Sequence, residues 1–251
     1  MTFSVMGYDP KTGQIGVASA TFSVNCSRYN VPYSIGVLPR FHENGAIILA
    51  QAFSSFPLPF IIGDLLVKGA SFDEVHEVMK QDSLNKVSQV GIVKVDGATW
   101  VYTGVDCEET KMHIQGKDYL VLGNVLASEK TFQTMAQAME TKNQPLSERM
   151  MRALEAGRDN GGQVDPYHGH LPELWAMMQV FDGGDRPLVD MRIDYEIDAV
   201  TRLRKLLDDL TPIAEYLNLE AMDNKRFRTM SRTTENPTLK LYKRDLVASQ
   251  K

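Results

Sequence analysis

Short alternations of apolar and polar residues open the chain and predict a β-hairpin. Phe3 and Val5 lie on one side of a period-two pattern, and the residues between and around them lie on the other side. Residues 9–13 combine Pro and Gly, which favour a tight turn, and an apolar run resumes at Ile15. We therefore expect residues 2–20 to form two paired strands.

The same patterns continue along the chain and predict further strands and helices. The expected strands cover residues 35–38, 46–50, 87–95, 99–103, 119–122, 174–181 and 188–193. The expected helices cover residues 57–68, 72–80, 128–141, 145–156 and 197–210. Ser71 and Glu74 match a capping box at the start of the second helix, and Gly157 is expected to end the fourth.

Strands cluster with strands in this order, and helices cluster with helices. Such an order is typical of a layered α+β fold and not of alternating units with a parallel sheet. We expect a four-layer αββα sandwich of two antiparallel sheets flanked by helices. Residues 1–210 contain no linker rich in Gly, Ser or Pro and are expected to form one domain. Residues 211–251 are expected to be a partly helical or disordered extension, with a loop over residues 226–237.

The composition excludes several classes of protein. The chain has 251 residues, of which 43% are hydrophobic, and a formal net charge of -5, so a disordered chain is not expected. Its most apolar stretch, residues 53–67, is interrupted by Ser, Pro and Asp, so no membrane span is expected. A pI near 5.6 argues against a nucleic-acid surface. No basic segment precedes an apolar run at the start, so we expect no signal peptide and a cytoplasmic protein.

Metal and cofactor motifs are sparse. Cys26 and Cys107 lie in no paired metal motif and are expected to be free thiols, and no cofactor is expected. The sequence contains no phosphate loop, dinucleotide-binding glycine pattern, zinc-protease helix or serine-hydrolase elbow. His168 and His170 with Asp165 invite a metal interpretation, whereas a local hydrogen-bonded turn explains the same Gly- and Pro-containing loop.

The most suggestive chemistry lies at the first two residues. Met1 precedes Thr2, a small residue that permits removal of an initiator methionine. Thr2 would then carry a hydroxyl and a free α-amine, whose ordinary pKa near 7.7–8.0 lets it act as a base near neutral pH. A threonine hydroxyl activated by its own amine is a nucleophile. Any residue retained in front of Thr2 would remove that amine.

Short segments spread along the chain carry a family resemblance. They are residues 2–5, 12–18, 88–93, 103–104 with Cys107, His113, Gly116 and Tyr119, residues 123–127, 152–157 and 189–194. In this order and spacing the sequence resembles the bacterial family called domain of unknown function 1028, which is grouped with the N-terminal nucleophile hydrolases. The similarity runs from Thr2 to about Leu207.

The resemblance implies an αββα sandwich with Thr2 where N-terminal nucleophile hydrolases keep their nucleophile. Those enzymes cleave amide bonds through an acyl-enzyme intermediate and stabilise its oxyanion with preorganised donors. Asn124 and Gln51 are the candidate donors on matching positions, and Ser19 is a candidate for the pocket wall. Asn124 as a left-handed turn residue and Gln51 as a hydrogen-bonded edge residue remain alternatives. His113 is a candidate group that titrates near neutral pH.

Two features depart from the family. Relatives usually carry a run like Arg-Gly-Arg-Gln-Ser-Ala where this chain has residues 168–173, which weakens a carboxylate-binding pocket. No lysine occurs between Lys11 and Lys68, so the base would be the α-amine itself. Two functions stay open: an amidohydrolase acting on a small amide, and a catalytically degenerate ligand-binding or scaffold protein. A metal-dependent hydrolase using the loop at residues 165–170 is a third, and a homo-oligomer is expected in each case.

Overall fold

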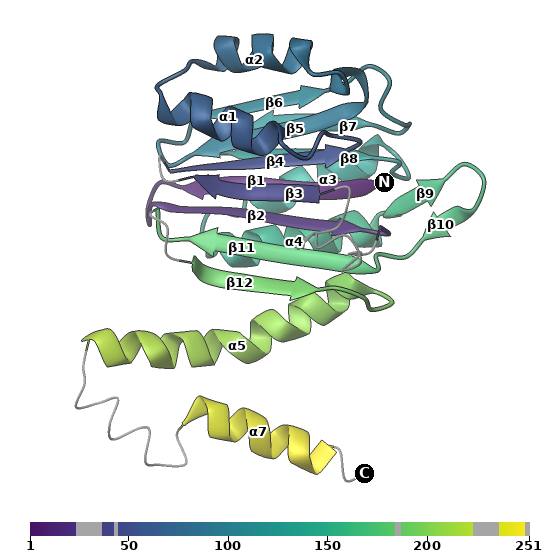
Figure 1. The fold of residues 1–251 in the computed structure, drawn as a ribbon. Coiled ribbons are helices and arrows are strands. Elements are labelled where there is room, and N and C mark those ends of the chain that lie inside the picture. The colour runs from purple at the N-terminus through teal and green to yellow at the C-terminus, as the bar shows by residue number, and fades with distance from the viewer. Residues whose placement is uncertain (24–36, 43–44, 184–186, 223–235, 249–251) are drawn as a thin grey trace. The chain divides into compact units, whose positions relative to one another are not determined.

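Two antiparallel β-sheets form the centre of the structure, a computed structural model that describes residues 1–23, 37–42, 45–183, 187–222 and 236–248 (Figure 1). The chain divides into two compact units, Met1–Leu203 and Arg204–Lys251. Both sheets lie in the first unit. Cys26, and the turn expected at residues 43–45 apart from Gly45, lie outside the described residues.

The larger sheet has six strands. In spatial order they are β12 (Pro187–Ile193), β11 (Trp175–Phe181), β2 (Gln14–Thr21), β1 (Thr2–Asp9), β8 (Tyr119–Asn124) and β7 (Met112–Gly116). The smaller sheet has four, in the order β3 (Val37–His42), β4 (Ala46–Ala52), β5 (Ser88–Lys94) and β6 (Thr99–Thr103). The expected hairpin at residues 2–20 is the β1–β2 pair.

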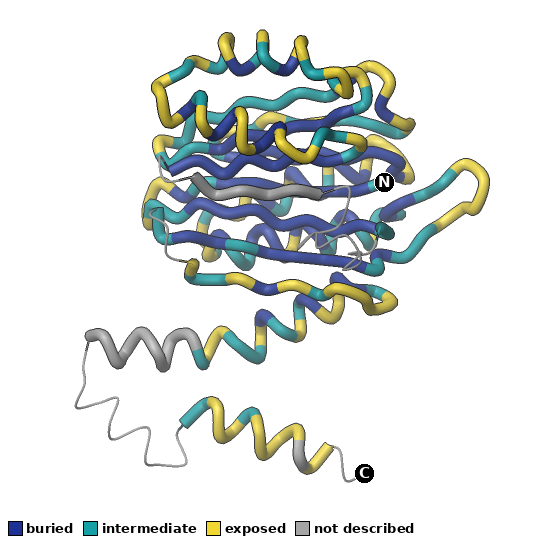
Figure 2. Tube along the Cα trace, in the orientation of Figure 1, coloured by how far each residue is buried: buried dark blue, intermediate teal, exposed yellow. Residues whose placement is uncertain are grey.

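Helices cover the outer face of each sheet, which gives the expected four-layer αββα sandwich (Figure 1). The helices are α1 (Leu58–Val67) and α2 (Phe72–Gln81) on the four-stranded sheet, and α3 (Glu129–Met139) and α4 (Leu146–Asp159) on the six-stranded sheet. The capping box of Ser71 and Glu74 is present at the start of α2. Buried residues follow the strands β1, β2, β4, β5, β8 and β11, and exposed residues lie on the outer faces of the helices (Figure 2).

The end of α4 corrects one expectation. The helix does not stop before Gly157 but continues to Asp159, and the chain turns at Gly161 and Gly162, which have positive φ. Gly157 is needed for close packing instead, because a Cβ there would lie 3.1 Å from the ring of Phe3. The glycine therefore lets α4 approach β1, and the turn glycines after it end the helix.

Several elements were not expected from the sequence. They are β7, a short 3-10 helix at Asn85–Val87, the hairpin of β9 (Gln163–Asp165) and β10 (Gly169–Leu171), and the helix α7 (Pro237–Ala248). The strand expected at residues 35–38 is β3, which ends four residues later. The helix expected at residues 197–210 is α5 (Ala199–Met222), which does not stop near residue 210 but passes through Pro212. The Thr211 hydroxyl donates to the Leu207 carbonyl beside that proline (2.7 Å).

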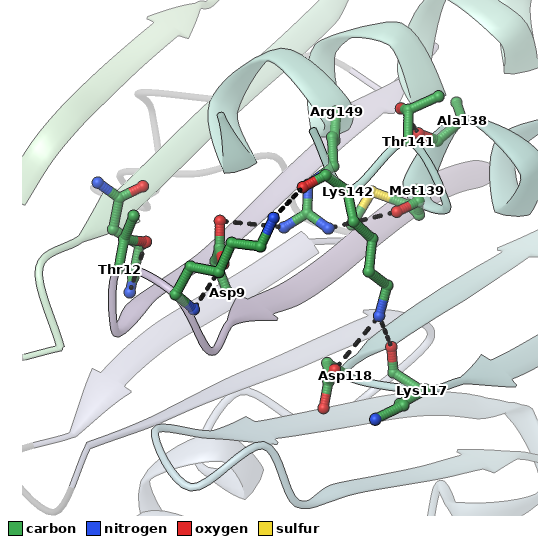
Figure 3. A network of polar contacts seen from close by, with 11 residues as sticks. Asp9, Thr12, Lys117, Asp118, Ala138, Met139, Thr141, Lys142 and Arg149 are labelled. Atoms are coloured by element: carbon green, nitrogen blue, oxygen red, sulfur yellow. Dashed lines mark hydrogen bonds and ion pairs between the residues drawn. The ribbon is translucent and has the colours of Figure 1, made fainter. Parts of the chain in front are cut away.

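A buried ion pair closes the sandwich at the end of β1 that lies away from the chain start (Figure 3). Arg149 of α4 lies 3.7 Å from the carboxylate of Asp9, and both side chains are buried. The turn after β1 adds a bond from the Lys11 backbone N–H to Asp9 (2.9 Å). Lys142 bonds to Asp118 beside this pair. Arg149 thus joins α4 to the end of β1, and Lys142 joins the segment between α3 and α4 to the turn between β7 and β8.

The second unit contains most of α5 and all of α7. Arg244 of α7 donates two hydrogen bonds to the carboxylate of Asp209 of α5, at 2.6 and 3.0 Å. These bonds and a bond from Lys205 lower the pKa of Asp209. Asn236 caps α7 by accepting from two backbone N–H groups of its first turn.

Candidate functional site

The layer between the two sheets changes from apolar to polar toward the start of β1. Met6 belongs to the apolar cluster between the sheets, together with Leu49 and Val93 of the smaller sheet. Thr2 and Ser4 have the same parity on β1 as Met6 and therefore face the same layer. This end of the layer is the candidate site.

Four side chains form a row across the six-stranded sheet at this end. Trp175 pairs with Thr21, the Thr21 hydroxyl lies 3.3 Å from the Thr2 hydroxyl, and Thr2 pairs with Asn124. The row thus crosses β11, β2, β1 and β8 in that order. All four residues are buried, with exposed fractions of 0 to 2%. We call these residues the Thr2 row, in which Thr2 and Thr21 hold the central positions.

Polar residues of the smaller sheet face the Thr2 row. Gln51 pairs with Gln89 across β4 and β5, and Gln89 pairs with Thr103 of β6. The Gln89 Oε1 accepts hydrogen bonds from Gln51 Nε2 (2.9 Å) and from Asn124 Nδ2 (2.8 Å). This one oxygen therefore binds an amide side chain from each of the two sheets. The Gln89 Nε2 donates to the Gly123 carbonyl (2.8 Å). Gln51, Gln89 and Asn124 are the amide network.

Ser19 is connected to this network through Ser4. The Ser4 hydroxyl donates to Gln51 Oε1 (2.6 Å), and the Ser4 and Ser19 hydroxyl oxygens lie 2.6 Å apart. Both serines are fully buried. The structure therefore brings the predicted residues Thr2, Ser19, Gln51 and Asn124 to one end of the layer between the sheets.

The Thr2 hydroxyl has oxygen partners in the described residues. It lies 2.6 Å from the Met1 carbonyl oxygen, and the Thr21 hydroxyl donates to the same oxygen (2.6 Å). Two hydroxyls thus converge on the carbonyl of the peptide bond that precedes Thr2. Burial lowers the pKa of the amine at the start of the chain, and the charges of Glu108 and Asp165 partly oppose this shift.

His113 lies farther from Thr2 than the other predicted residues. It stands on β7 and pairs with Leu122, so β8 separates it from β1. Its Nδ1 lies 2.9 Å from the Thr103 hydroxyl, which accepts from Gln89 Nε2 at 3.2 Å. Burial lowers the pKa of His113. The histidine is thus connected to the amide network but does not contact Thr2.

The loop that suggested a metal site forms a hydrogen-bonded turn. Asp165 accepts from the backbone N–H groups of Tyr167 and His168 and lies 2.8 Å from the His168 ring. His170 instead lies 3.2 Å from the Gly161 carbonyl. In the part of the chain that the structure describes, no group of three or more His, Cys, Asp or Glu side chains is arranged to hold a metal ion. Cys107 is a buried free thiol there.

Comparisons with known proteins decide the family. The model of the family of unknown function DUF1028 matches residues 2–203. The chain belongs to this family. Protein SPO2555 from Silicibacter pomeroyi, a DUF1028 structure, matches with a TM-score of 0.70 and 26% identity, and the match covers 84% of this chain and 86% of that one.

Two Anbu structures also match this DUF1028 chain. A Gly-1 mutant from Hyphomicrobium sp. strain MC1 has a TM-score of 0.43 and 10% identity, with coverage of 85% of this chain and 96% of that one. Anbu from Yersinia bercovieri has a TM-score of 0.40 and 14% identity, with coverage of 83% and 93%. No curated protein sequence matches the chain. Among the described helices, none is long and apolar enough to cross a membrane.

Backbone geometry in this DUF1028 chain decides whether Asn124 is a left-handed turn residue. Asn124 is the last residue of β8, and the left-handed residue is the next one, Val125, with a φ of 57°. Gln51 is likewise followed by a left-handed residue, Ala52, with a φ of 63°. Positive φ is costly for a β-branched valine. Each strained residue thus follows a member of the amide network, where the chain leaves the sheet.

Sequence reasoning missed three residues of this site in the DUF1028 chain: Thr21, Gln89 and Trp175. Strand register was the available signal, because counting back from the turn at residues 9–13 places Thr21 opposite Thr2. Gln89 lies in a segment that carries the family resemblance, but nothing in its local sequence assigned it to the site. Trp175 required the pairing of β11 with β2, strands far apart in the sequence.

Proposed function

We propose that this chain is an N-terminal nucleophile amidohydrolase that cleaves an amide bond of a small molecule, with Thr2 as nucleophile once Met1 is removed. The observation that carries the proposal is the position of the Thr2 hydroxyl. It lies buried between Thr21 and Asn124 and faces Gln51 and Gln89 of the opposite sheet. Titratable and hydrogen-bonding groups brought together in a buried cluster are typical of an active site.

The proposed reaction uses two groups of Thr2. Its hydroxyl oxygen attacks the amide carbonyl carbon, and the hydroxyl proton passes to the α-amine of the same residue. The carbon–nitrogen bond then breaks, and the amine product leaves with that proton. Water hydrolyses the resulting ester, which releases the carboxylic acid and restores the hydroxyl.

Burial supports the α-amine as the base. Burial lowers the pKa of the amine of Met1, and the amine of Thr2 would lie one residue farther into the protein. A lowered pKa keeps more of the amine neutral at pH 7, which is the form that accepts a proton. We therefore assign the base to Thr2 itself.

Asn124 is the proposed oxyanion donor. Its Nδ2 donates one N–H to Gln89 Oε1, and among the described residues the second N–H has no hydrogen-bond acceptor. Gln89 fixes the orientation of this amide, so the donor is held in place before the reaction. Removing one such donor lowers kcat by about 100-fold or more in other acyl transfer enzymes.

Intact-mass analysis and a covalent probe test the proposal. The native protein should begin at Thr2, and a small β-lactone should add its mass to the N-terminal peptide. Thr2→Ser should keep this labelling, whereas Thr2→Val, which removes only the hydroxyl, should abolish it. Thr12→Val, in the exposed turn after β1, is the matched control. Retention of Met1 in active protein would rule out the mechanism.

A ligand-binding protein without turnover is the second candidate. It is favoured by the partners of the Thr2 hydroxyl, which in the described residues are two oxygens and no basic nitrogen. If this candidate is correct, small amides should raise the melting temperature of the protein, and no product should form when they are incubated with it. If the native protein and Thr2→Val formed product at the same rate, both candidates would be contradicted. The first assigns catalysis to the Thr2 hydroxyl, and the second expects no product.

We also propose that residues 1–210 carry this site and that residues 211–251 join copies of the chain into a homo-oligomer. Helix α7 exposes the apolar side chains of Leu239, Tyr242 and Val247. Light scattering on the full chain tests this proposal. A monomeric mass for the native protein would reject it, and Tyr242→Asp should lower the mass of an oligomer.

A further inference from the structure

Three buried side-chain nitrogens lack a hydrogen-bond partner in the described chain. Two belong to Arg149, in the ion pair at the far end of β1, and the third is the indole Nε1 of Trp175. Trp175 has an exposed fraction of 0%. Buried donors are nearly always paired in native proteins, so an unpaired one needs a specific explanation.

The position of Trp175 supplies that explanation. Trp175 ends the Thr2 row on the side of Thr21 and belongs to the cluster between the sheets. Adjacent strands lie about 4.8 Å apart, so the backbones of Trp175 and Thr2 are separated by about 10 Å. An indole ring spans much of that distance. Both side chains face the layer between the sheets, so a small molecule bound at Thr2 can extend to Trp175 across the one strand between them.

The second tryptophan shows the contrast. Trp100 lies on the outer side of the smaller sheet, where it stacks on Tyr102 at 6.3 Å and meets the ring of His76 edge-on. These ring contacts account for its position through packing. Trp175 combines the same bulk with a buried, unpaired N–H, and it lies two strands from the proposed nucleophile in the same row.

We propose that Trp175 is a substrate-binding residue, whose indole N–H donates to an uncharged oxygen acceptor next to the amide that is cleaved. That the bound molecule is a substrate rests on the proposed function, whereas the binding contact itself does not. The substrate class is a small amide with a hydroxyl or carbonyl oxygen near its amide group. Such an oxygen would satisfy the indole N–H that the protein leaves unpaired.

The surrounding charges favour an uncharged acceptor. The side chains of the Thr2 row and of the amide network are neutral, so a carboxylate there would be buried without a cation. The acidic residues Glu108 and Asp165 act on the start of the chain and would repel an anion. A neutral donor with a neutral acceptor avoids both costs.

Indole nitrogen NMR on the processed protein tests the contact directly. The chain has two tryptophans, and Trp100→Phe assigns the two indole N–H resonances. The probes are lactamide, isobutyramide and alaninamide, which differ only in a hydroxyl, a methyl or an ammonium group. Lactamide should shift the Trp175 resonance saturably and leave that of Trp100 in place. Isobutyramide and alaninamide should bind about tenfold more weakly, since the methyl or ammonium group that replaces the hydroxyl cannot accept a hydrogen bond.

Several results would overturn the inference. They are an unmoved Trp175 resonance at the highest lactamide concentration, equal affinities for lactamide and isobutyramide, and an unchanged preference for lactamide in Trp175→Phe. Because the resonance is observed in the unmodified protein, the test does not depend on the folding of that variant.

The same experiment separates this inference from the proposed function. Thr2→Val removes the nucleophile and should keep the lactamide shift. If lactamide shifts Trp175 but the native protein hydrolyses none of the probes and resists the β-lactone, the binding contact stands and the catalytic proposal fails. If hydrolysis occurs while Trp175 never responds, the catalytic proposal stands and this inference fails.

Discussion

Replacing Gln89 with leucine tests whether the amide network holds the two sheets together at the site. Leucine fills a similar volume but offers no acceptor, so Gln51 Nε2 and Asn124 Nδ2 each lose the oxygen that they bind at 2.9 and 2.8 Å. Both residues are buried, with exposed fractions of 0 and 2%, so bulk water does not readily replace the lost partner.

The expected loss of stability follows from these two donors. A buried donor left without a partner costs about 1–3 kcal/mol, so two cost about 2–6 kcal/mol. A domain of this size is stable by about 5–15 kcal/mol, so Gln89→Leu should remove a large part of its free energy of unfolding. We expect a loss near 4 kcal/mol, the middle of that range.

Urea unfolding monitored by tryptophan fluorescence measures this loss. Trp100 and Trp175 both lie in strands of the sandwich, so the signal follows the unit that contains the network. The matched control is Gln115→Leu, an exposed glutamine whose Nε2 bonds to Thr99, which should change stability by less than about 0.5 kcal/mol. A loss below about 1 kcal/mol for Gln89→Leu would refute the reasoning, because the network would then contribute little.

Two further predictions concern the base and the packing of α4. Glu108→Gln removes a negative charge that raises the pKa of the amine at the start of the chain. The acidic limb of the pH–rate profile should therefore move to lower pH by a few tenths of a unit. The control is Glu109→Gln, which should leave the limb in place because the Glu109 carboxylate is paired with Lys111. A limb that moves upward or stays fixed would argue against the amine as base. Gly157→Ala should lower the melting temperature and cost about 1–3 kcal/mol, although alanine is the better helix former, because the new Cβ would lie 3.1 Å from Phe3. An increase in melting temperature on calorimetry would show that α4 moves away freely.

Local sequence signals predicted the order of the main elements because those elements have clear periodicity and caps. The hairpin of β1 and β2, the capping box at Ser71 and the four-layer architecture are all confirmed. The edge strand β7 was missed because it is short and none of its five residues is fully buried; two are exposed and three are half-buried. The β9–β10 hairpin has only three residues in each strand, too few to give a pattern.

The C-terminal extension was expected to be partly helical or disordered, but the bounds of its helices were not predicted. The helix expected at residues 197–210 continues through Pro212 in α5, and Pro237, the last residue of the expected loop, begins α7. Proline is well tolerated in the first turn of a helix, and Asn236 before it is a favourable cap. The dipeptide Asn236-Pro237 was therefore a signal for the start of a helix, although both residues were expected to lie in a loop.

The candidate site was only partly predictable, since its residues meet through strand pairing. Thr2 was identified from the chemistry of one residue, and the resemblance added Gln51 and Asn124. Gln89 and Trp175 carry no local motif, and their roles depend on which strands are neighbours. Long-range register is not encoded in any short window of sequence.

The burial of Thr2 in the middle of the six-stranded sheet has a practical consequence for anyone who purifies this protein. An affinity tag fused ahead of the first residue would have to leave a crowded interior, and it would also block processing to a free threonine. A tag after residue 251 adds to the second unit and leaves β1 as it is. Inactivity measured on amino-tagged material would therefore say nothing about the untagged protein.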